Sequence, residues 1–163
     1  MIFDKNLILS GDQTYSGLSG QAHSLSSSTA VNSDNVIDLI QARDLSASED
    51  LYLYIKLLTT FTPATSVATA LEINLVAVDS ATDGGNSLNY VIAGTGDNYI
   101  QNLNAKGEFI LKISPQFDTI GRRYLMLKYW RSIGTETVAG SVFAGLTMGV
   151  NVIKNYPSAT TII

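Results

Sequence analysis

The chain has 163 residues, of which 45% are hydrophobic and 15% are charged, with a formal net charge of −4 and a pI near 4.7. This length suffices for one buried core, so we expect a single domain over residues 1–163, and the acidic balance leaves no basic stripe that would bind nucleic acid directly. The absence of cysteine excludes disulfides and thiolate metal sites, and one histidine is too few for a histidine-based zinc site.

The N-terminal region carries one apolar triplet, Leu7, Ile8 and Leu9, between charged and polar residues. This triplet is far shorter than the roughly 7 to 15 apolar residues of a signal-peptide core, so we expect a first strand and no export signal. No window reaches the roughly 18 uninterrupted apolar residues of a membrane-spanning helix. A membrane partner is therefore not expected.

Residues 14–33 are rich in Ser and Gly and nearly uncharged. They offer too little apolar surface to offset the entropy lost on ordering, which predicts a long loop or an arm that gains order on another surface. Tyr15, Leu18 and His23 lie in this stretch and are candidate interface residues. A catalytic histidine needs a third group that holds it rigidly, and only serines surround this one, so we expect His23 to be exposed in a loop.

Residues 36–40 allow two interpretations. Their apolar side chains fit one side of a helix capped by Ser33 or Asp34, and the same short run fits a strand. The periodicity does not decide between the helix and the strand.

Alternation of apolar and polar residues predicts the main strands. It is clearest in LYLYIKLL, where Leu51 to Leu57 place apolar side chains on one face and Tyr52, Tyr54 and Lys56 on the other. Further runs cover residues 71–78, 107–114, 122–130 and 140–150, with shorter candidates at residues 7–9, 36–40, 88–92 and 99–103. Glycine-rich turns separate these runs, which predicts an all-β, single-domain, jelly-roll-like β-sandwich of eight or nine strands.

Tyr52, Tyr54 and Trp130 lie on strand faces opposite the aliphatic residues. Aromatic side chains with a polar end are typical anchors of protein interfaces, so these three are candidate contacts with another chain. The same side chains would suit a stacking platform for a sugar. Coverage of both faces within the monomer is an equally open alternative.

Motifs for catalysis or metal binding are incomplete. The stretch DSATDGGNSLNY lacks the EF-hand ligands at its third and twelfth positions, and GTGDNY lacks the third glycine of a dinucleotide-binding loop. A β-sandwich glycosidase would need only two acids about 5 to 9 Å apart, yet most acids fall at strand ends or in loops. We expect no enzyme, no metal and no cofactor. The candidate acids are Glu49, Asp50, Glu72 and Glu108.

Five stretches taken together resemble, in order and spacing, the capsid cement proteins of tailed bacteriophages of the Bbp16 type. They are DKNLILSGDQ, NVIDLIQARDLSASEDLYLYIKL, GEFILKISPQF, RRYLMLKYW and AGSVFAGLT. The family's D-K-x-L-x-L-S stretch matches Asp4, Lys5, Leu7, Leu9 and Ser10, and its N-V-I-D-L stretch matches residues 35–39. In LIQARD this chain departs from its relatives, which tend to have a glycine soon after the leucine.

The resemblance implies a jelly-roll protein of the virion, located on the outer capsid surface and made in the bacterial host cytoplasm. It implies a homo-oligomer, with a dimer favoured over a trimer, that clamps neighbouring subunits of the major capsid protein. It carries no catalytic residues and favours a strand at residues 35–39. Two other classes stay open: a carbohydrate-binding β-sandwich module that uses Tyr52, Tyr54 or Trp130, and a hydrolase with two facing carboxylates.

Overall fold

The computed structural model describes residues 5–14, 17–25, 30–39, 51–63, 68–82, 90–103, 107–113 and 122–148. Sheet I contains β1 (Ile8–Ser10), β4 (Gln21–Leu25), β7 (Leu51–Leu57), β11 (Glu108–Ile113) and β13 (Val138–Met148). Sheet II contains β5 (Val31–Asn32), β6 (Ile37–Asp38), β8 (Ala70–Val78), β9 (Tyr90–Gly94), β10 (Asn98–Tyr99) and β12 (Tyr124–Ile133). The strands β2 (Asp12–Thr14) and β3 (Gly17–Ser19) form a separate hairpin, and two 3-10 turns are η1 (Lys5–Leu7) and η2 (Ile100–Asn102). Within these ranges, no helix has the length and apolar composition needed to cross a membrane.

Long strands occupy the centre of each sheet, and shorter strands share edges. In sheet I, β1 and β4 pair end to end with one edge of β13, and β7 and β11 follow on its other side. In sheet II, β5 and β6 share one edge of β12, while β9 and β10 share the far edge of β8. Within the described residues each sheet therefore has four strand positions, and together these match the eight or nine strands that the sequence predicts.

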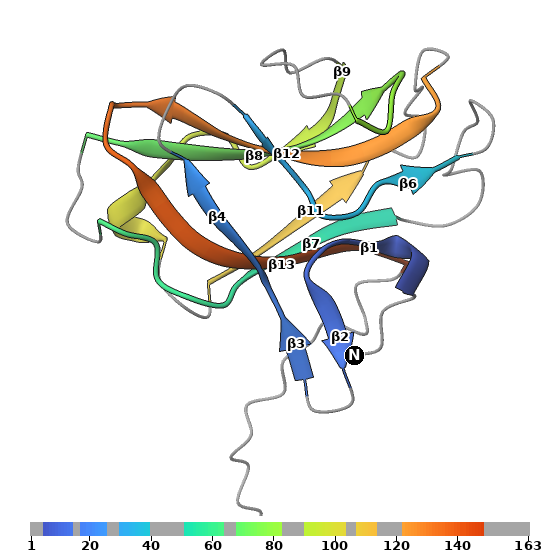
Figure 1. Ribbon diagram of the computed structural model, residues 1–163, viewed down its shortest axis with the longest axis horizontal. Helices are drawn as coiled ribbons and strands as arrows, with labels where there is room; N and C mark the ends of the chain where they lie inside the picture. Colours follow the sequence, from blue (N-terminus) through green and yellow to red (C-terminus); the bar gives the residue numbers. More distant parts are fainter. Residues whose placement is uncertain are drawn as a thin grey trace, which may run out of the picture.

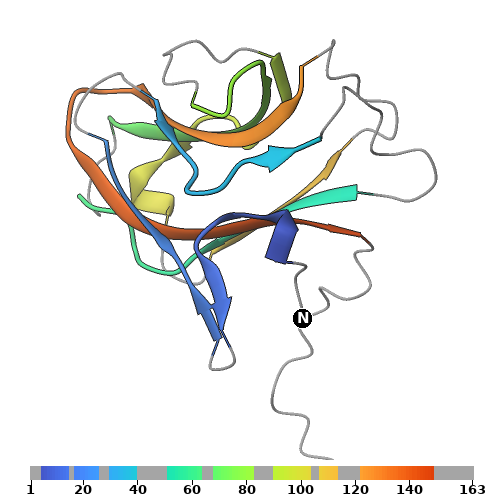
Figure 2. The same ribbon diagram turned by 45° about the vertical axis from the view of Figure 1, so that its right-hand side comes forward.

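The two antiparallel sheets pack as a sandwich, as Figures 1 and 2 show. Between strand positions the chain changes sheet at most connections, for example from β4 to β5, from β7 to β8 and from β12 to β13. Eight strand positions connected in this manner form a jelly roll. The fold class predicted from the sequence is confirmed.

Alternating apolar residues of the central strands meet between the sheets and form the core. Leu53 and Ile55 of β7 are fully buried in one cluster with Leu75 of β8 and Leu127 of β12. Full burial of a side chain of this size contributes about 1.5 to 3 kcal/mol. The core is therefore built by the strands whose alternation is most regular in the sequence.

The outer face of sheet II is buried in part, as the half-apolar second face of β8 suggests. Val76, Val78 and Met126 form a second buried cluster, against which Val36 and Tyr124 pack. This cluster covers the end of the sheet where β6 pairs with β12.

Polar groups link the two sheets along the side where β1 and β4 lie. The Tyr129 hydroxyl of β12 donates a hydrogen bond of 2.6 Å to Ser10 Oγ of β1, and both residues are fully buried. The backbone N–H of Asp34, which precedes β6, donates to Gln21 Oε1 of β4 at 2.9 Å. Burial raises the pKa of Tyr129, so its hydroxyl keeps the proton that it donates.

Residues 14–33 are not the long loop or arm that their composition predicts, because their described part contains β3, β4 and β5. β4 pairs with β13, and β5 pairs with β12. In β4, His23 and Leu25 are buried, whereas Ala22 and Ser24 are exposed. Small and polar residues hide this alternation in the sequence, since neither face of the strand looks apolar.

Two shorter predictions have opposite outcomes. Residues 36–40 contain β6, so the strand alternative is correct at Ile37 and Asp38, whereas residue 40 lies outside the described residues. The strand predicted at residues 99–103 is correct only at Tyr99, which belongs to β10; Ile100–Asn102 form η2, after which the Leu103 N–H donates to the Ile100 carbonyl at 3.0 Å. Both side chains are buried, because residues three apart on a single 3-10 turn face the same way.

We expect Tyr129→Phe to lower the free energy of unfolding by about 1 to 2 kcal/mol, because it removes a buried hydrogen bond and leaves Ser10 Oγ unsatisfied. Urea unfolding of the wild type, Tyr129→Phe, Ser10→Ala and the double variant measures this. The double variant should cost less than the sum of the two single changes, by about 1 kcal/mol. Strict additivity would show that the hydroxyl groups do not interact.

Candidate interaction surface

Residues 11–20 interrupt one strand position of sheet I. β1 ends at Ser10, opposite Ala144, and β4 begins at Gln21, opposite Val142. A single residue of β13 separates these pairs, so the intervening segment has no room along this edge. It leaves the sandwich as the hairpin β2–β3, which projects away from both sheets in Figures 1 and 2.

Glycines at the base of the hairpin allow the chain to leave and re-enter the sheet. Gly11 has a φ of 79°, and a Cβ there would lie 2.1 Å from the carbonyl oxygen of Ser19. A Cβ on Gly20 would lie 2.4 Å from Ser141 Oγ of β13. A side chain at Gly11 would meet the backbone of the opposite strand, so this position requires glycine.

The hairpin contacts a small apolar patch on the outer face of sheet I, which we call the outer cluster. Ile8, Tyr54 and Phe143 are buried at its centre, and Leu18 of β3 and Leu58 pack against them. The rings of Tyr54 and Phe143 lie 6.5 Å apart at an angle of 60°, a tilted arrangement usual for aromatic pairs. Three strands of the sheet and the hairpin therefore meet at one apolar site.

Tyr54 lies where the outer cluster meets a pair of charges. Tyr54 pairs with Gly145 of β13, and Gly145 pairs with Ile8 of β1 on its other edge. Because glycine has no side chain, the side chains of Tyr54 and Ile8 can approach each other across it. The Tyr54 hydroxyl donates to Glu108 Oε1 at 2.8 Å, and this oxygen lies 3.4 Å from Lys56 Nζ. Burial, followed by the hydrogen bond and charge of Glu108, raises the pKa of Tyr54. A buried apolar cluster thus borders a partly exposed pair of charges.

The structure brings together some of the predicted interface residues and separates others. Tyr52, Tyr54 and Leu18 lie on the outer side of sheet I, where Tyr52 is half-buried and Tyr54 is only 3% exposed. Trp130 is half-buried on the outer face of sheet II, on the other side of the sandwich. These aromatics therefore do not form one stacking platform for a sugar. Tyr15 lies outside the described residues.

His23 is not exposed in a loop, and the expectation of an interface role is wrong in that respect. It is 3% exposed in β4, and its ring lies 3.7 Å from that of Tyr129, centroid to centroid. Gly140 of β13 lies opposite in the register, and the space that a side chain there would fill is occupied by the Phe61 ring. Within the described part of the chain, neither ring nitrogen has a hydrogen-bond partner, and burial lowers the pKa of His23 to about 4.

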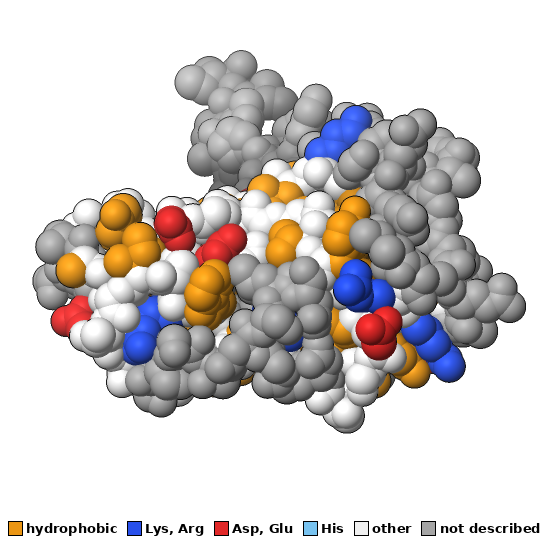
Figure 3. Space-filling view, turned by 90° about the horizontal axis from the view of Figure 1, so that it is seen from above, with side chains coloured by type: hydrophobic (Ala, Val, Ile, Leu, Met, Phe, Trp, Pro, Cys, Tyr) orange, Lys and Arg blue, Asp and Glu red, His pale blue; other side chains and the backbone are white. Residues whose placement is uncertain are grey.

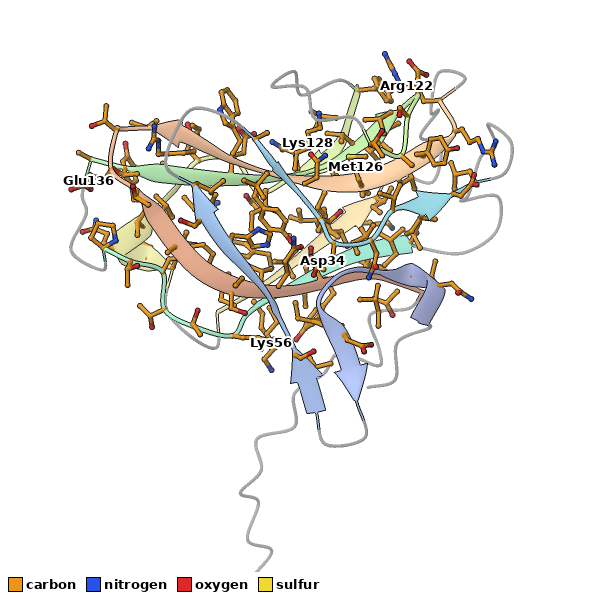
Figure 4. The ribbon with its side chains drawn as sticks, viewed as in Figure 1. Asp34, Lys56, Arg122, Met126, Lys128 and Glu136 are labelled. Atoms are coloured by element: carbon orange, nitrogen blue, oxygen red, sulfur yellow. The ribbon has the colours of Figure 1, made fainter. Side chains whose placement is uncertain are left out.

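The outer face of sheet II offers a different kind of surface. Figure 3 looks onto this side, where the hydrophobic side chains lie in separate groups with charged side chains between them. Figure 4 places Met126 and Lys128 on this side and Lys56 on the side of the hairpin. The hairpin thus packs against the apolar outer cluster of sheet I and not against sheet II.

The described residues do not assemble the paired acids of a hydrolase from the predicted candidates. Glu72 of β8 pairs with Trp130 on the outer face of sheet II, whereas Glu108 lies on the outer face of sheet I. Glu49 and Asp50 fall outside the described residues. No group of side chains suited to a metal ion occurs in the part of the chain that the structure describes.

Sequence reasoning missed Ile8, Phe143 and Glu108 as parts of this surface. Alternation does place Phe143 on the outer face of its strand, since its neighbours in sequence are core residues. What the sequence does not show is that β13 lies between β1 and β7, which brings the three strands together.

No family model and no curated protein matches the chain. Among solved structures, the chain is similar to one described as "CBM4 structure and function", with 8% identity and a TM-score of 0.42 over 88% of this chain and 94% of that chain. It is also similar to one described as "Structure of infectious bursal disease virus Gx strain", with 15% identity and a TM-score of 0.24 over 86% of this chain and 35% of that chain. Neither similarity bears on what this chain binds.

We expect acid to destabilise the fold through His23. Its usual pKa is 6.5 and its pKa in the fold is about 4, so below about pH 6.5 the unfolded chain takes up a proton that the folded chain does not. The free energy of unfolding should therefore fall as the pH decreases from 6.5 to 4, by about 3 kcal/mol in total. His23→Phe retains a ring beside Tyr129 and should lose this component. Urea unfolding at a series of pH values measures it, and parallel curves for both proteins would contradict the prediction.

Proposed function

We propose that this chain is a structural virion protein, a cement protein that binds the outer surface of a tailed-phage head and clamps neighbouring major capsid subunits. The observation that carries the proposal is the hairpin β2–β3, which is inserted into a strand position that is continuous without it. A domain whose sandwich does not need such a segment can use it for contact with another surface. The resemblance of the sequence to cement proteins supports the same function.

The surface beside the hairpin has the composition of a contact site. Leu18 and Leu58 keep part of their apolar surface exposed above the buried Ile8, Tyr54 and Phe143, and the pair of Lys56 and Glu108 at the margin keeps partial exposure of 31% and 21%. Interfaces commonly combine an apolar centre with a polar rim. The low overall charge also favours contact by shape, since few charges must be stripped of water on binding.

Each contact with a shell can be weak, because the molecule would act in many copies. An oligomer that holds one capsid subunit binds the next at a high effective concentration. We propose that the chain bridges subunits of the major capsid protein as a homo-oligomer, with a dimer favoured. In this proposal the protein is made in the bacterial host cytoplasm, acts on the outer capsid, and has no catalytic role, cofactor, membrane partner or direct contact with nucleic acid.

The test replaces residues 11–20 with a single threonine. This variant keeps the register, because the new residue lies opposite Phe143 while Ser10 and Gln21 keep their own partners. We expect cooperative unfolding, with a loss of about 1 to 2 kcal/mol from the missing Leu18 contact. Added to undecorated heads of the phage that encodes the chain, the variant should need at least about tenfold more protein for the occupancy of the wild type, as counted by electron cryo-microscopy.

A pair of point variants controls for general loss of apolar surface. Leu18→Ser changes the hairpin, and Ile133→Ser removes an exposed apolar side chain of sheet II. Only the first should weaken decoration of heads. Full occupancy by the hairpin-free variant would exclude the hairpin as the contact, and failure of the wild type to bind heads would overturn the function.

A further inference from the structure

Lys128 of β12 and Asn74 of β8 form a buried polar pair on the outer face of sheet II. They lie directly opposite each other in the antiparallel register, and Figure 4 places Lys128 on this face. Lys128 is 0% exposed and Asn74 is 1% exposed. Lysine is rarely buried to this degree, because its ammonium group is strongly hydrated in water. The pair therefore brings an amine and an amide together in a place closed to solvent.

The amide group of Asn74 is not used in the hydrogen bonding of the fold. Among the described residues, neither its oxygen nor its nitrogen has a hydrogen-bond partner. Its Oδ1 lies close to β9, since a Cβ on Gly94 would be 2.0 Å from it. A buried amide without partners destabilises a fold, and native structures keep few of them. As a purely structural side chain, Asn74 would therefore only weaken the sheet.

The spacing of the pair allows a covalent bond between the two side chains. The Cβ atoms of directly opposed residues in antiparallel strands lie about 4.5 to 5.5 Å apart, and a lysine side chain is long enough to cross this distance. Val76 and Met126, the next outward residues along the two strands, are fully buried in one apolar cluster. An amine held beside an amide in such surroundings is positioned for nucleophilic attack, because no encounter step is needed.

Glu72 provides a carboxylate next to this pair. It lies two residues before Asn74 on the same face of β8, and it pairs with Trp130, two residues after Lys128 on β12. Glu72 is therefore a diagonal neighbour of Lys128, and long side chains span the roughly 7 to 8 Å between diagonal positions. It is half-buried, so it lies at the border between the pair and the solvent. This position suits a group that carries protons between the two nitrogens.

We propose that Lys128 and Asn74 join in an intramolecular isopeptide bond, which the folded chain forms by itself. Glu72 accepts a proton from the lysine ammonium, and the neutral Nζ attacks Cγ of Asn74. The Nζ–Cγ bond forms and the Cγ–Nδ2 bond breaks, while Nδ2 receives through Glu72 the two protons that Nζ loses. Nδ2 leaves as ammonium, and Glu72 is a carboxylate again. No atom is oxidised or reduced, and no co-reactant is consumed.

The first test is the intact mass of the wild-type chain under denaturing conditions, and it involves no phage head. We expect a mass about 17 Da below that calculated from the sequence, because the chain loses one ammonia. Trypsin should not cleave after Lys128, so residues 124–131 should stay together and be joined to residues 57–106, which contain Asn74. A chain of full mass overturns the proposal, and so does the release of residues 124–128 as a free peptide.

The second test removes the reacting groups one at a time. Asn74→Ala and Lys128→Met should each have the full mass calculated for the variant. Asn32→Ala is the matched control, because Asn32 lies directly opposite Lys128 on its other side but is only half-buried. This control should keep the deficit of about 17 Da. A deficit that disappears in Asn32→Ala and persists in Asn74→Ala overturns the assignment to Asn74.

The third test concerns the proton transfer. Glu72→Gln keeps the size of the side chain and removes its ability to accept a proton. The cross-linked fraction, measured as intact mass at set times after synthesis, should rise at least about a hundredfold more slowly than in the wild type. Equal rates in the two proteins would exclude Glu72 as the proton carrier.

Discussion

The shared edge of β13 is the constraint on which the rest of the structure depends. β1 and β4 occupy the same strand position, so the chain between them must leave the sheet. The same geometry directs Ser10 and His23 toward the core, where both meet Tyr129 of the opposite sheet. The closed side of the sandwich and the projecting hairpin are therefore two results of one pairing pattern.

The central strands of sheet I stabilise the core and form the outer surface at the same time. In β7, Ile55 faces the core and Tyr54 faces outward, and in β13 Ala144 and Phe143 do the same. The strands that carry the outer cluster are thus held in place by the packing of their other face in the core. The central side chains of the outer cluster are held by packing within the domain.

The sequence predicts the central strands well, because a two-residue period is visible wherever one face is aliphatic. It predicts the outward direction of Tyr54 and Trp130 for the same reason, but not that they lie on opposite sheets, since alternation gives a face and not a neighbour. The sequence does not reveal β4, because small residues mask its alternation, and the burial of His23 is therefore not apparent from the sequence. Of the arm predicted from composition, only the part in the hairpin β2–β3 projects from the sandwich, and its glycines and polar residues resemble those of a loop.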